Sequence, residues 1–245
     1  MLVVRNSKII TTKKCGQFRI ALVSDLHIPV SERLALKTIR AIQDNNVDAI
    51  LIAGDLRKHR FRADESAAFL KRMHAQTGKK IYMVMGDSDP CSLFGPCIYC
   101  TRYSGSPPDS ISCLILRDST VFLSPSITVS GLDYTKDDNW QLPDFGRETP
   151  PETFNVFLLH TTAKIEESFF GRFDLSLAGN THGGQVAPSV FISIALDPEI
   201  DGRFMRGRYY PGGKPLIVTS GIGTSFLPIR FGVPPEVIII DIEGK

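Results

Sequence analysis

The hydrophobic positions of the chain form short continuous runs, and most of these runs end at a polar motif. Apolar runs at 18–24, 47–53, 80–85 and 154–159 are typical of strands that are buried on both faces of a sheet. We therefore predict strands over these residues, and another strand over 174–178.

Two segments with a helical pattern separate the first three predicted strands. Ser31 is a capping residue in front of a periodic segment that ends near Asn45. A second helix is predicted from about Asp64 to Gln76, with Gly78 just past its end. Alternating strands and helices favour a mostly parallel sheet, and sites in such sheets lie beyond the carboxyl ends of the strands.

The rhythm of strands and helices changes after the third strand. Residues 90–112 are rich in Pro, Gly, Ser and Cys and are typical of a loop or a small cap. Shorter strands are predicted further along, over 113–117, 120–123, 127–131, 215–219 and 236–242. We expect one domain over residues 1–245, with a Cys-rich loop or cap inserted at about 90–113.

The composition limits the classes of partner that the protein can bind. The 245 residues are 42% hydrophobic and carry a formal net charge of +2, which argues against binding nucleic acid through bulk charge. The first residues lack the pattern of a signal peptide, and no apolar run reaches the roughly 18 residues of a membrane span. We expect a cytoplasmic protein, and peripheral contact with a membrane surface stays open.

The polar motifs after the strands carry the candidate chemistry. They are Asp25-Leu26-His27, Gly54-Asp55, Gly86-Asp87-Ser88-Asp89, His160 and Gly179-Asn180-Thr181-His182. A site for two divalent metals about 3.5–4 Å apart needs a bridging carboxylate with ligands on either side. Asp55 is the expected bridge, because Gly54 before it lets the backbone turn sharply.

The remaining candidate ligands divide into two sets around Asp55. The first ligand set is Asp25, His27 and His182, and the second ligand set is Asp87, His160 and Asn180. Oxygen and imidazole ligands without thiolate suit Mn, Fe, Zn or Mg. Two such ions would activate a water and neutralise the charge of a phosphate.

The order of these motifs resembles the calcineurin-like metallophosphoesterase superfamily, whose pattern is D-x-H, GD, GNH-[DE], H and G-H-x-H. The stretch GNTHGGQ at 179–185 is similar to the GHTHGGQ of one branch, and so is the tail at 221–236. That branch includes enzymes that cleave the diphosphate of UDP-2,3-diacylglucosamine. The resemblance implies an α/β fold, a four-layer α/β/β/α sandwich with a dimetal site at one end of the two sheets.

The chain departs from the family pattern at three positions. Asp87 stands where the family has an Asn ligand, and Asn180 stands where it has a His ligand. Ser88 replaces a His that contacts the substrate phosphate and helps the leaving group, and a hydroxyl cannot donate a proton near neutral pH as imidazole does. The first ligand set is thus intact by type, whereas the second is altered.

We expect a metal-dependent phosphohydrolase that acts on a phosphate ester or diphosphate. The substrate is expected to be a phosphorylated small molecule or, if the branch resemblance carries function, a nucleotide-diphosphate lipid. Candidate catalytic residues are Asp55, Asp89 and His160, and candidate substrate-binding residues are Ser88, Arg57 and Arg230. Alternatively, Ser88 and Asp89 only form a turn before Pro90.

Two other functions stay open. The losses at Ser88 and Asn180 are also compatible with a catalytically degenerate protein that uses the fold for binding or as a scaffold. The four cysteines Cys91, Cys97, Cys100 and Cys113 indicate a possible structural zinc site, or a metal-based redox or sensing protein built on residues 91–113. The alternative is that Cys113 is a buried strand residue and the other three are loop thiols.

Overall fold

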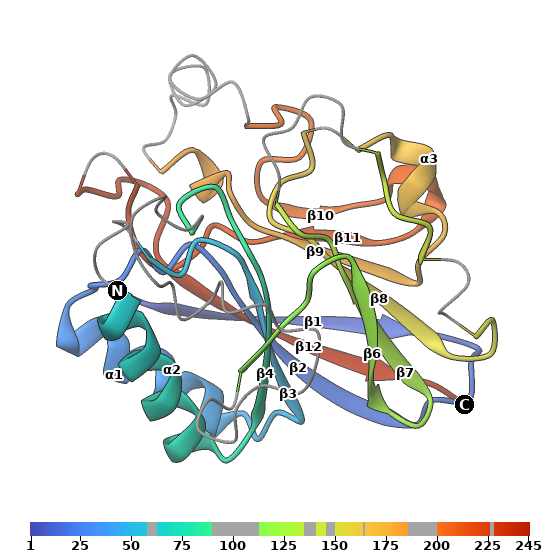
Figure 1. Cartoon of the computed structure of the whole chain (residues 1–245), viewed down its shortest axis with the longest axis horizontal. Helices are drawn as coiled ribbons and strands as arrows, with labels where there is room; N and C mark the ends of the chain where they lie inside the picture. The colour runs from blue at the N-terminus through green and yellow to red at the C-terminus, as the bar shows by residue number, and fades with distance from the viewer. Residues whose placement is uncertain are drawn as a thin grey trace.

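Two six-stranded sheets lie face to face, α1 and α2 cover the outer face of one sheet, and α3 packs against the other (Figure 1). This computed structural model describes residues 1–57, 63–89, 113–134, 141–145, 150–163, 165–185, 200–225 and 228–245. The expected α/β sandwich is confirmed.

The first sheet has the strand order β1-β12-β2-β3-β4-β5. Its strands are β1 (Val3–Ile10), β12 (Glu236–Glu243), β2 (Gln17–Val23), β3 (Ala49–Ala53), β4 (Lys80–Val84) and β5 (Cys113–Ile115). Neighbouring strands are parallel except for the β12–β2 pair. The prediction of a mostly parallel sheet is therefore confirmed for this half of the molecule.

The second sheet has the order β10-β11-β9-β8-β7-β6. Its strands are β10 (Gly207–Tyr209), β11 (Leu216–Val218), β9 (Leu175–Ala178), β8 (Phe154–Leu158), β7 (Ile127–Gly131) and β6 (Ser119–Ser124). The pairs at its two edges are antiparallel, and the strands between them are parallel.

The helices are α1 (Glu32–Asp44), α2 (Ala63–Thr77) and the short α3 (Glu167–Phe170). The predicted cap is present, since the Oγ atom of Ser31 accepts a hydrogen bond from the Leu34 backbone N–H at 3.3 Å. No helix among the described residues is long and apolar enough to cross a bilayer.

Alternate residues of the buried strands supply different layers of the core. In β2, Ala21 and Val23 pack toward α1 and α2, whereas Ile20 and Leu22 pack between the two sheets. This arrangement explains the continuous apolar runs, because both faces of these strands are covered.

The pattern missed β1, β10 and α3. Ile9 is the only buried residue of β1, which lies at the sheet edge beside β12 and so lacks an apolar run. The predicted cap at 90–113 lies, apart from Cys113, outside the described residues.

Candidate active site

Polar side chains from both sheets meet at the carboxyl ends of the strands. Asp25 and His27 follow β2, Asp55 follows β3, Asp87 follows β4, His160 follows β8, and Asn180 and His182 follow β9. Parallel neighbours in each sheet bring these ends to the same edge. The structure therefore brings together the candidate ligands that the sequence placed after separate strands.

The backbone at these positions is unusual. Eight non-glycine residues among those described have a left-handed φ, and five of them are candidate ligands. These five are Asp25 (φ 50°), His27 (φ 47°), Asp55 (φ 53°), Asn180 (φ 68°) and His182 (φ 48°). Such a conformation costs on the order of 1 kcal/mol or more per residue and tends to concentrate at functional sites.

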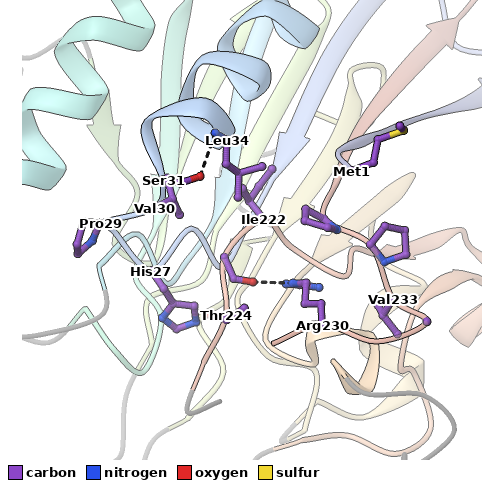
Figure 2. A pocket seen from close by; sticks show the side chains of 14 residues that line it. Met1, His27, Pro29, Val30, Ser31, Leu34, Ile222, Thr224, Arg230 and Val233 are labelled. Atoms are coloured by element: carbon purple, nitrogen blue, oxygen red, sulfur yellow. Dashed lines mark hydrogen bonds between the residues drawn. The ribbon is translucent and has the colours of Figure 1, made fainter. Parts of the chain in front are cut away.

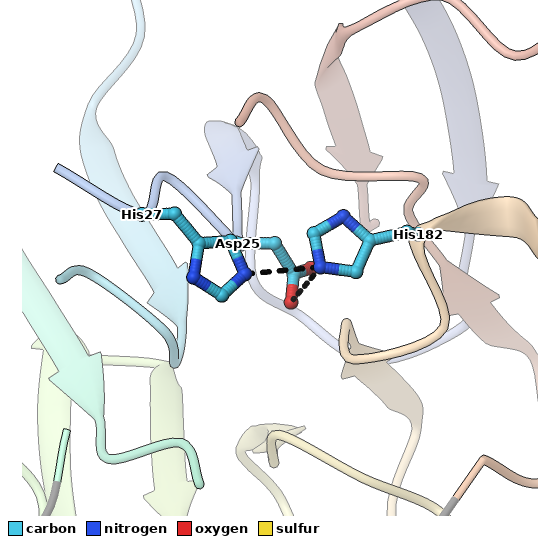
Figure 3. A group of neighbouring side chains, drawn as sticks. All are labelled: Asp25, His27 and His182. Atoms are coloured by element: carbon cyan, nitrogen blue, oxygen red, sulfur yellow. Dashed lines mark hydrogen bonds and ion pairs between the residues drawn. The ribbon is translucent and has the colours of Figure 1, made fainter. Parts of the chain in front are cut away.

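The first ligand set converges on a single point (Figure 3). The Nε2 atoms of His27 and His182 lie 3.0 Å apart, and the His182 Nε2 lies 3.7 Å from Oδ1 of Asp25. That Oδ1 atom is buried and has no hydrogen-bond partner among the residues that the structure describes. A buried carboxylate oxygen without a partner is costly, so this geometry fits a bound cation.

His160 is the centre of the second ligand set. Its Nδ1 lies 2.8 Å from the carbonyl oxygen of Ala53, so the ring donates a proton there and turns its Nε2 toward the site. This Nε2 lies 3.1 Å from Oδ1 of Asp87 and 3.5 Å from Oδ1 of Asp55. Two carboxylates around one imidazole nitrogen are a suitable donor set for a divalent cation.

Asp55 lies between the two ligand sets. Its Oδ2 is 3.4 Å from Nε2 of His27, and its Oδ1 faces His160. Ser88 contacts both oxygens, since its backbone N–H donates to Oδ1 at 2.9 Å and its hydroxyl donates to Oδ2 at 2.9 Å. The residue that replaces the family's His thus holds the central carboxylate.

The ionisation of the site follows from burial and from neighbouring charge. Burial raises the pKa of Asp25 to about 6 and raises that of Asp55 well above its ordinary value. Burial also lowers the pKa of His160, but the negative charge of Asp55 and the contact with Asp87 outweigh it and raise that pKa well above its ordinary value. Despite partial burial, the hydrogen bond from His160 lowers the pKa of Asp87 to about 2.

Two glycines allow the close packing of these side chains. A Cβ atom on Gly86 would collide with the carboxylate and the backbone N of Asp55. A Cβ atom on Gly54, which has a φ of 81°, would meet the His160 ring. The glycines of both motifs are therefore required by the approach of the ligands as well as by the turn.

The structure places Asp89 and Arg57 beside the site rather than in it. Asp89 is fully buried, and its carboxylate accepts from the backbone N–H groups of Leu56 (3.0 Å), Arg57 (3.3 Å) and Gly86 (2.9 Å). Arg57 is 1% exposed and donates to the Asp89 carbonyl. These contacts fasten the loop after β3 to the turn at Asp87 and Ser88. A turn just before Pro90, which was the alternative to a functional role for Ser88 and Asp89, is therefore present.

Arg230 reaches the site from the tail. Its Nε donates to the Gly223 carbonyl at 2.7 Å, and its Nη2 lies 3.1 Å from Nδ1 of His182. A guanidinium only donates, so Nδ1 of His182 accepts this hydrogen bond and carries no proton. A cation bound at Nε2 would leave the ring proton on Nδ1, where it would face the donor of Arg230. Binding of a cation at Nε2 therefore requires Arg230 to turn away. Burial lowers the pKa of Arg230 to about 10, which still leaves it charged at neutral pH.

Of the four cysteines, the structure describes Cys113 alone. It is a free, buried thiol in the core between the first sheet and its helices, and burial raises its pKa to about 12. This is the environment expected if Cys113 is a buried strand residue rather than a zinc ligand. Zinc binds the thiolate form of cysteine, which burial disfavours here. Cys91, Cys97 and Cys100 lie outside the described residues, so their zinc role stays a prediction.

One aromatic neighbour of the site, Tyr134, was not predicted from the sequence. Tyr134 meets His160 edge to face, with ring centroids 6.1 Å apart and an interplanar angle of 85°. Tyr134 follows β7, so the rule that placed the ligands after their strands would also have found it.

The residues present fit divalent cations. The ligand atoms of Asp25, His27 and His182 all lie within 4.8 Å of one another, and the same holds for those of Asp25, Asp55 and His160. All five residues are buried, so a cation would offset the cost of burying their charges.

Comparisons with known proteins find relatives that cover most of this chain. The family model described as calcineurin-like phosphoesterase matches residues 18–175. An uncharacterized metallophosphoesterase of Aquifex aeolicus is 25% identical over 241 residues, which cover 95% of this chain and 87% of that protein. The uncharacterized metallophosphoesterase YkuE of Bacillus subtilis is 24% identical over 244 residues, which cover 93% of this chain and 79% of that protein.

Solved structures share the fold. The crystal structure of TT1561 of Thermus thermophilus superposes with a TM-score of 0.54 at 12% identity, covering 86% of this chain and 91% of that one. At this identity the likeness supports the fold alone.

Proposed function

The chain belongs to the calcineurin-like phosphoesterase family, and from this premise we propose that it is a phosphohydrolase that uses two divalent metal ions on a phosphate ester or diphosphate. The single observation that carries the proposal is the convergence of buried Asp and His side chains from both sheets, with the Oδ1 atom of Asp25 left without a hydrogen-bond partner among the described residues.

Each of the two ligand sets would bind one of the two ions. The first ligand set would hold one ion, the second ligand set would hold the other, and Asp55 would contact both. When bound, such ions polarise a phosphoryl oxygen and lower the pKa of a water that attacks the phosphorus. The raised pKa of His160 favours a proton on its Nε2 beside Asp55 and Asp87, and a bound ion would take the place of that proton.

The other side chains orient the site and the phosphate. Arg230 is the candidate phosphate ligand, since its charged guanidinium lies against His182 at the edge of the site. Ser88 acts by holding Asp55, because both of its donors point at that carboxylate. Asp89 and Arg57 act as positioning residues through the loop they fasten.

A catalytically degenerate binding protein is the second candidate. The hydrogen bonds from Ser88 favour it, because they engage both oxygens of Asp55 without supplying a proton donor for a leaving group. This candidate predicts one bound metal or none, and no turnover.

The deciding experiment is hydrolysis of a bis-aryl phosphate diester and an aryl phosphate monoester by metal-stripped protein with added Mn²⁺. We expect turnover that requires the metal and falls at least about 100-fold in Asp55→Asn. Asp118→Asn is the matched control, because Asp118 has the same left-handed backbone (φ 48°) but lies exposed in the turn before β6.

If the protein is an enzyme, Asp118→Asn should keep wild-type turnover. Absence of turnover above that of Asp55→Asn with Mn, Fe, Zn and Mg would overturn the enzyme proposal in favour of the degenerate protein.

A further inference from the structure

Glu236 is a buried carboxylate that the proposed function does not use. It is the first residue of β12 and is 0% exposed. Two guanidinium groups pair with its Oε2 atom, with Nε of Arg5 at 2.6 Å and Nη2 of Arg206 at 3.0 Å. Burial of a carboxylate is costly unless its charge is paired, and these two contacts offset that cost on one side of the group.

The other oxygen of Glu236 holds the loop that follows β11, which we call the 219–223 loop. Its Oε1 accepts a hydrogen bond from the Ser220 backbone N–H at 2.8 Å and from the Thr219 hydroxyl at 3.3 Å. The Thr219 hydroxyl in turn accepts from the Gly221 N–H at 3.1 Å, and the Gly221 carbonyl accepts from the Glu236 N–H at 3.0 Å. Glu236 is therefore bonded to three consecutive residues of the loop.

The 219–223 loop lies against Asp25 of the first ligand set. The Gly223 N–H donates to the Asp25 carbonyl at 2.7 Å. A Cβ atom on Gly221 would lie 2.6 Å from the Cβ of Asp25, so the loop and the candidate ligand are in close contact. Asp25 has a left-handed φ of 50°, and such a conformation persists only where the surrounding structure holds it. The loop is one of the parts that hold it.

The 219–223 loop also holds Arg230. The Nε of Arg230 donates to the Gly223 carbonyl at 2.7 Å, and its Nη2 donates to the Ser220 carbonyl at 2.8 Å. Figure 2 shows the first of these bonds at the wall of a pocket of about 560 Å³. The candidate phosphate ligand thus takes its position from the same loop as Asp25.

Arg206 links Glu236 to the segment that carries His182. A Cβ atom on Gly183, the residue after His182, would lie 3.1 Å from Cδ of Arg206. Segments that Glu236 holds therefore lie beside two of the three residues in the first ligand set. Within the described part of the chain, neither Glu236 nor the 219–223 loop makes a hydrogen bond to a residue of the second ligand set.

We propose that Glu236 is a positioning residue for the first ligand set and acts on it through the 219–223 loop and Arg206. The proposal rests on the proposed function, since it concerns the metal site of that function. It assigns to one buried carboxylate the placement of Asp25, His182 and Arg230. Loss of this carboxylate should therefore weaken one metal position and spare the other, whereas a purely structural role would change the stability of the fold alone.

The test is a calorimetric titration of the metal-free full chain with Mn²⁺, in the wild type and in Glu236→Gln. Glutamine keeps the size of the side chain but offers one acceptor oxygen, so it cannot serve both the loop and the guanidinium groups. We expect Mn²⁺ at the first ligand set to bind at least about 10-fold more weakly, the usual cost of losing an outer partner of a metal ligand, and Mn²⁺ at the second set to change less than about twofold. The event that His182→Ala abolishes identifies the first set.

Glu243→Gln is the matched control. Glu243 ends the same strand, its side chain is 38% exposed, and it pairs with Lys8 at 2.7 Å on the surface, so its substitution should leave both Mn²⁺ affinities unchanged. Circular dichroism and the melting temperature check that each variant is folded. Thr219→Val decides if Glu236→Gln does not fold, because it removes only the hydroxyl between Glu236 and Gly221 and should weaken the same event about threefold.

Equal Mn²⁺ affinities in the wild type and folded Glu236→Gln would overturn the proposal, even where aryl phosphates are hydrolysed. An equal loss at both ligand sets would overturn it as well, because a positioning residue of the first set would spare the second. A selective loss at the first set supports the proposal, and absence of hydrolysis together with this result would contradict the proposed function alone. A wild type that binds no Mn²⁺ overturns both.

Discussion

The two ligand sets of the candidate metal site differ in burial and in partners. In the first ligand set, the Asp25 side chain is 0% exposed and offers an oxygen without a hydrogen-bond partner among the described residues. In the second ligand set, the Asp87 side chain is 33% exposed and its carboxylate is already paired with His160. The first set therefore needs a cation more than the second does.

Asp55 connects the two sets, and Ser88 changes its role. Both hydrogen bonds from Ser88 end on Asp55, so a cation on either side competes with a donor for the same oxygens. The chain thus keeps one strong candidate metal position, while the changes from the family pattern are concentrated around the other.

The largest expected effect comes from removing one carboxylate charge from each set. Asp25→Asn should lower Mn²⁺-dependent turnover about 1,000-fold, whereas Asp87→Asn should lower it about 10-fold, because Asp87 is partly exposed and Asn is the ligand of the family pattern. Initial rates on an aryl diester measure both, with Asp118→Asn as the control. Equal losses in the two variants would contradict the difference between the sets.

A smaller effect is expected from restoring the family's His beside the site. Ser88→His removes the hydroxyl from Asp55 and adds an imidazole, so turnover of a phenyl ester should rise at least about tenfold. The gain should be larger for phenyl than for p-nitrophenyl esters, because the poorer leaving group benefits more from proton donation.

Ser88→Ala is the matched variant for this experiment. It also frees Asp55 but supplies no proton donor, so its turnover should not depend on the leaving group more than that of the wild type. An equal gain in Ser88→Ala and Ser88→His would show that release of Asp55, rather than the imidazole, is responsible.

A thermal effect of metal should depend on pH through the buried candidate ligands, of which Asp25 is one. Its pKa is about 6 in the folded chain and 3.8 for an ordinary aspartate, so the stability linked to it is present below about pH 4 and is lost as the pH rises through 6. Mn²⁺ binds the ionised form, so the rise in melting temperature with Mn²⁺ should be about 3–5 °C larger at pH 7.5 than at pH 5.

Differential scanning fluorimetry at fixed Mn²⁺ concentration measures this difference. Asp118→Asn, which keeps the ligand sets, should show the same difference as the wild type. A Mn²⁺ shift that is equal at both pH values would contradict the assignment of these buried side chains as metal ligands.

The smallest effect is expected at Cys113. Cys113→Ala should cost about 1 kcal/mol of unfolding free energy by leaving a small cavity, and it should leave the metal content unchanged. Urea unfolding and elemental analysis measure the two quantities. Zinc that is bound by the wild type and lost in Cys113→Ala would support the four-cysteine site instead.

The sequence was sufficient for the parts of the fold that have strong local patterns. The runs that became β2, β3, β4 and β8 are buried on both faces, so their apolar residues are contiguous and easily recognised. β1 was not predicted because it pairs with β12, more than two hundred residues away, and buries Ile9 alone, so its sequence lacks a continuous apolar run.

The positions of the candidate ligands were predictable from the sequence, whereas the contacts around them were not. Asp25, Asp55 and His182 follow strands whose ends the sheet order brings together, so their proximity follows from position. The contacts of Ser88 with Asp55 and of Arg57 with Asp89 depend on turn geometry and burial, which no spacing in the chain reveals.

The most direct test of the account is a titration of metal-free protein with Mn²⁺, followed by electron paramagnetic resonance and calorimetry. We predict two binding events of unequal affinity, with the tighter event lost in His182→Ala and the weaker event lost in Asp87→Ala. A tight event that survives His182→Ala and disappears in Asp87→Ala would contradict the account, because it would place the stronger metal position in the second ligand set.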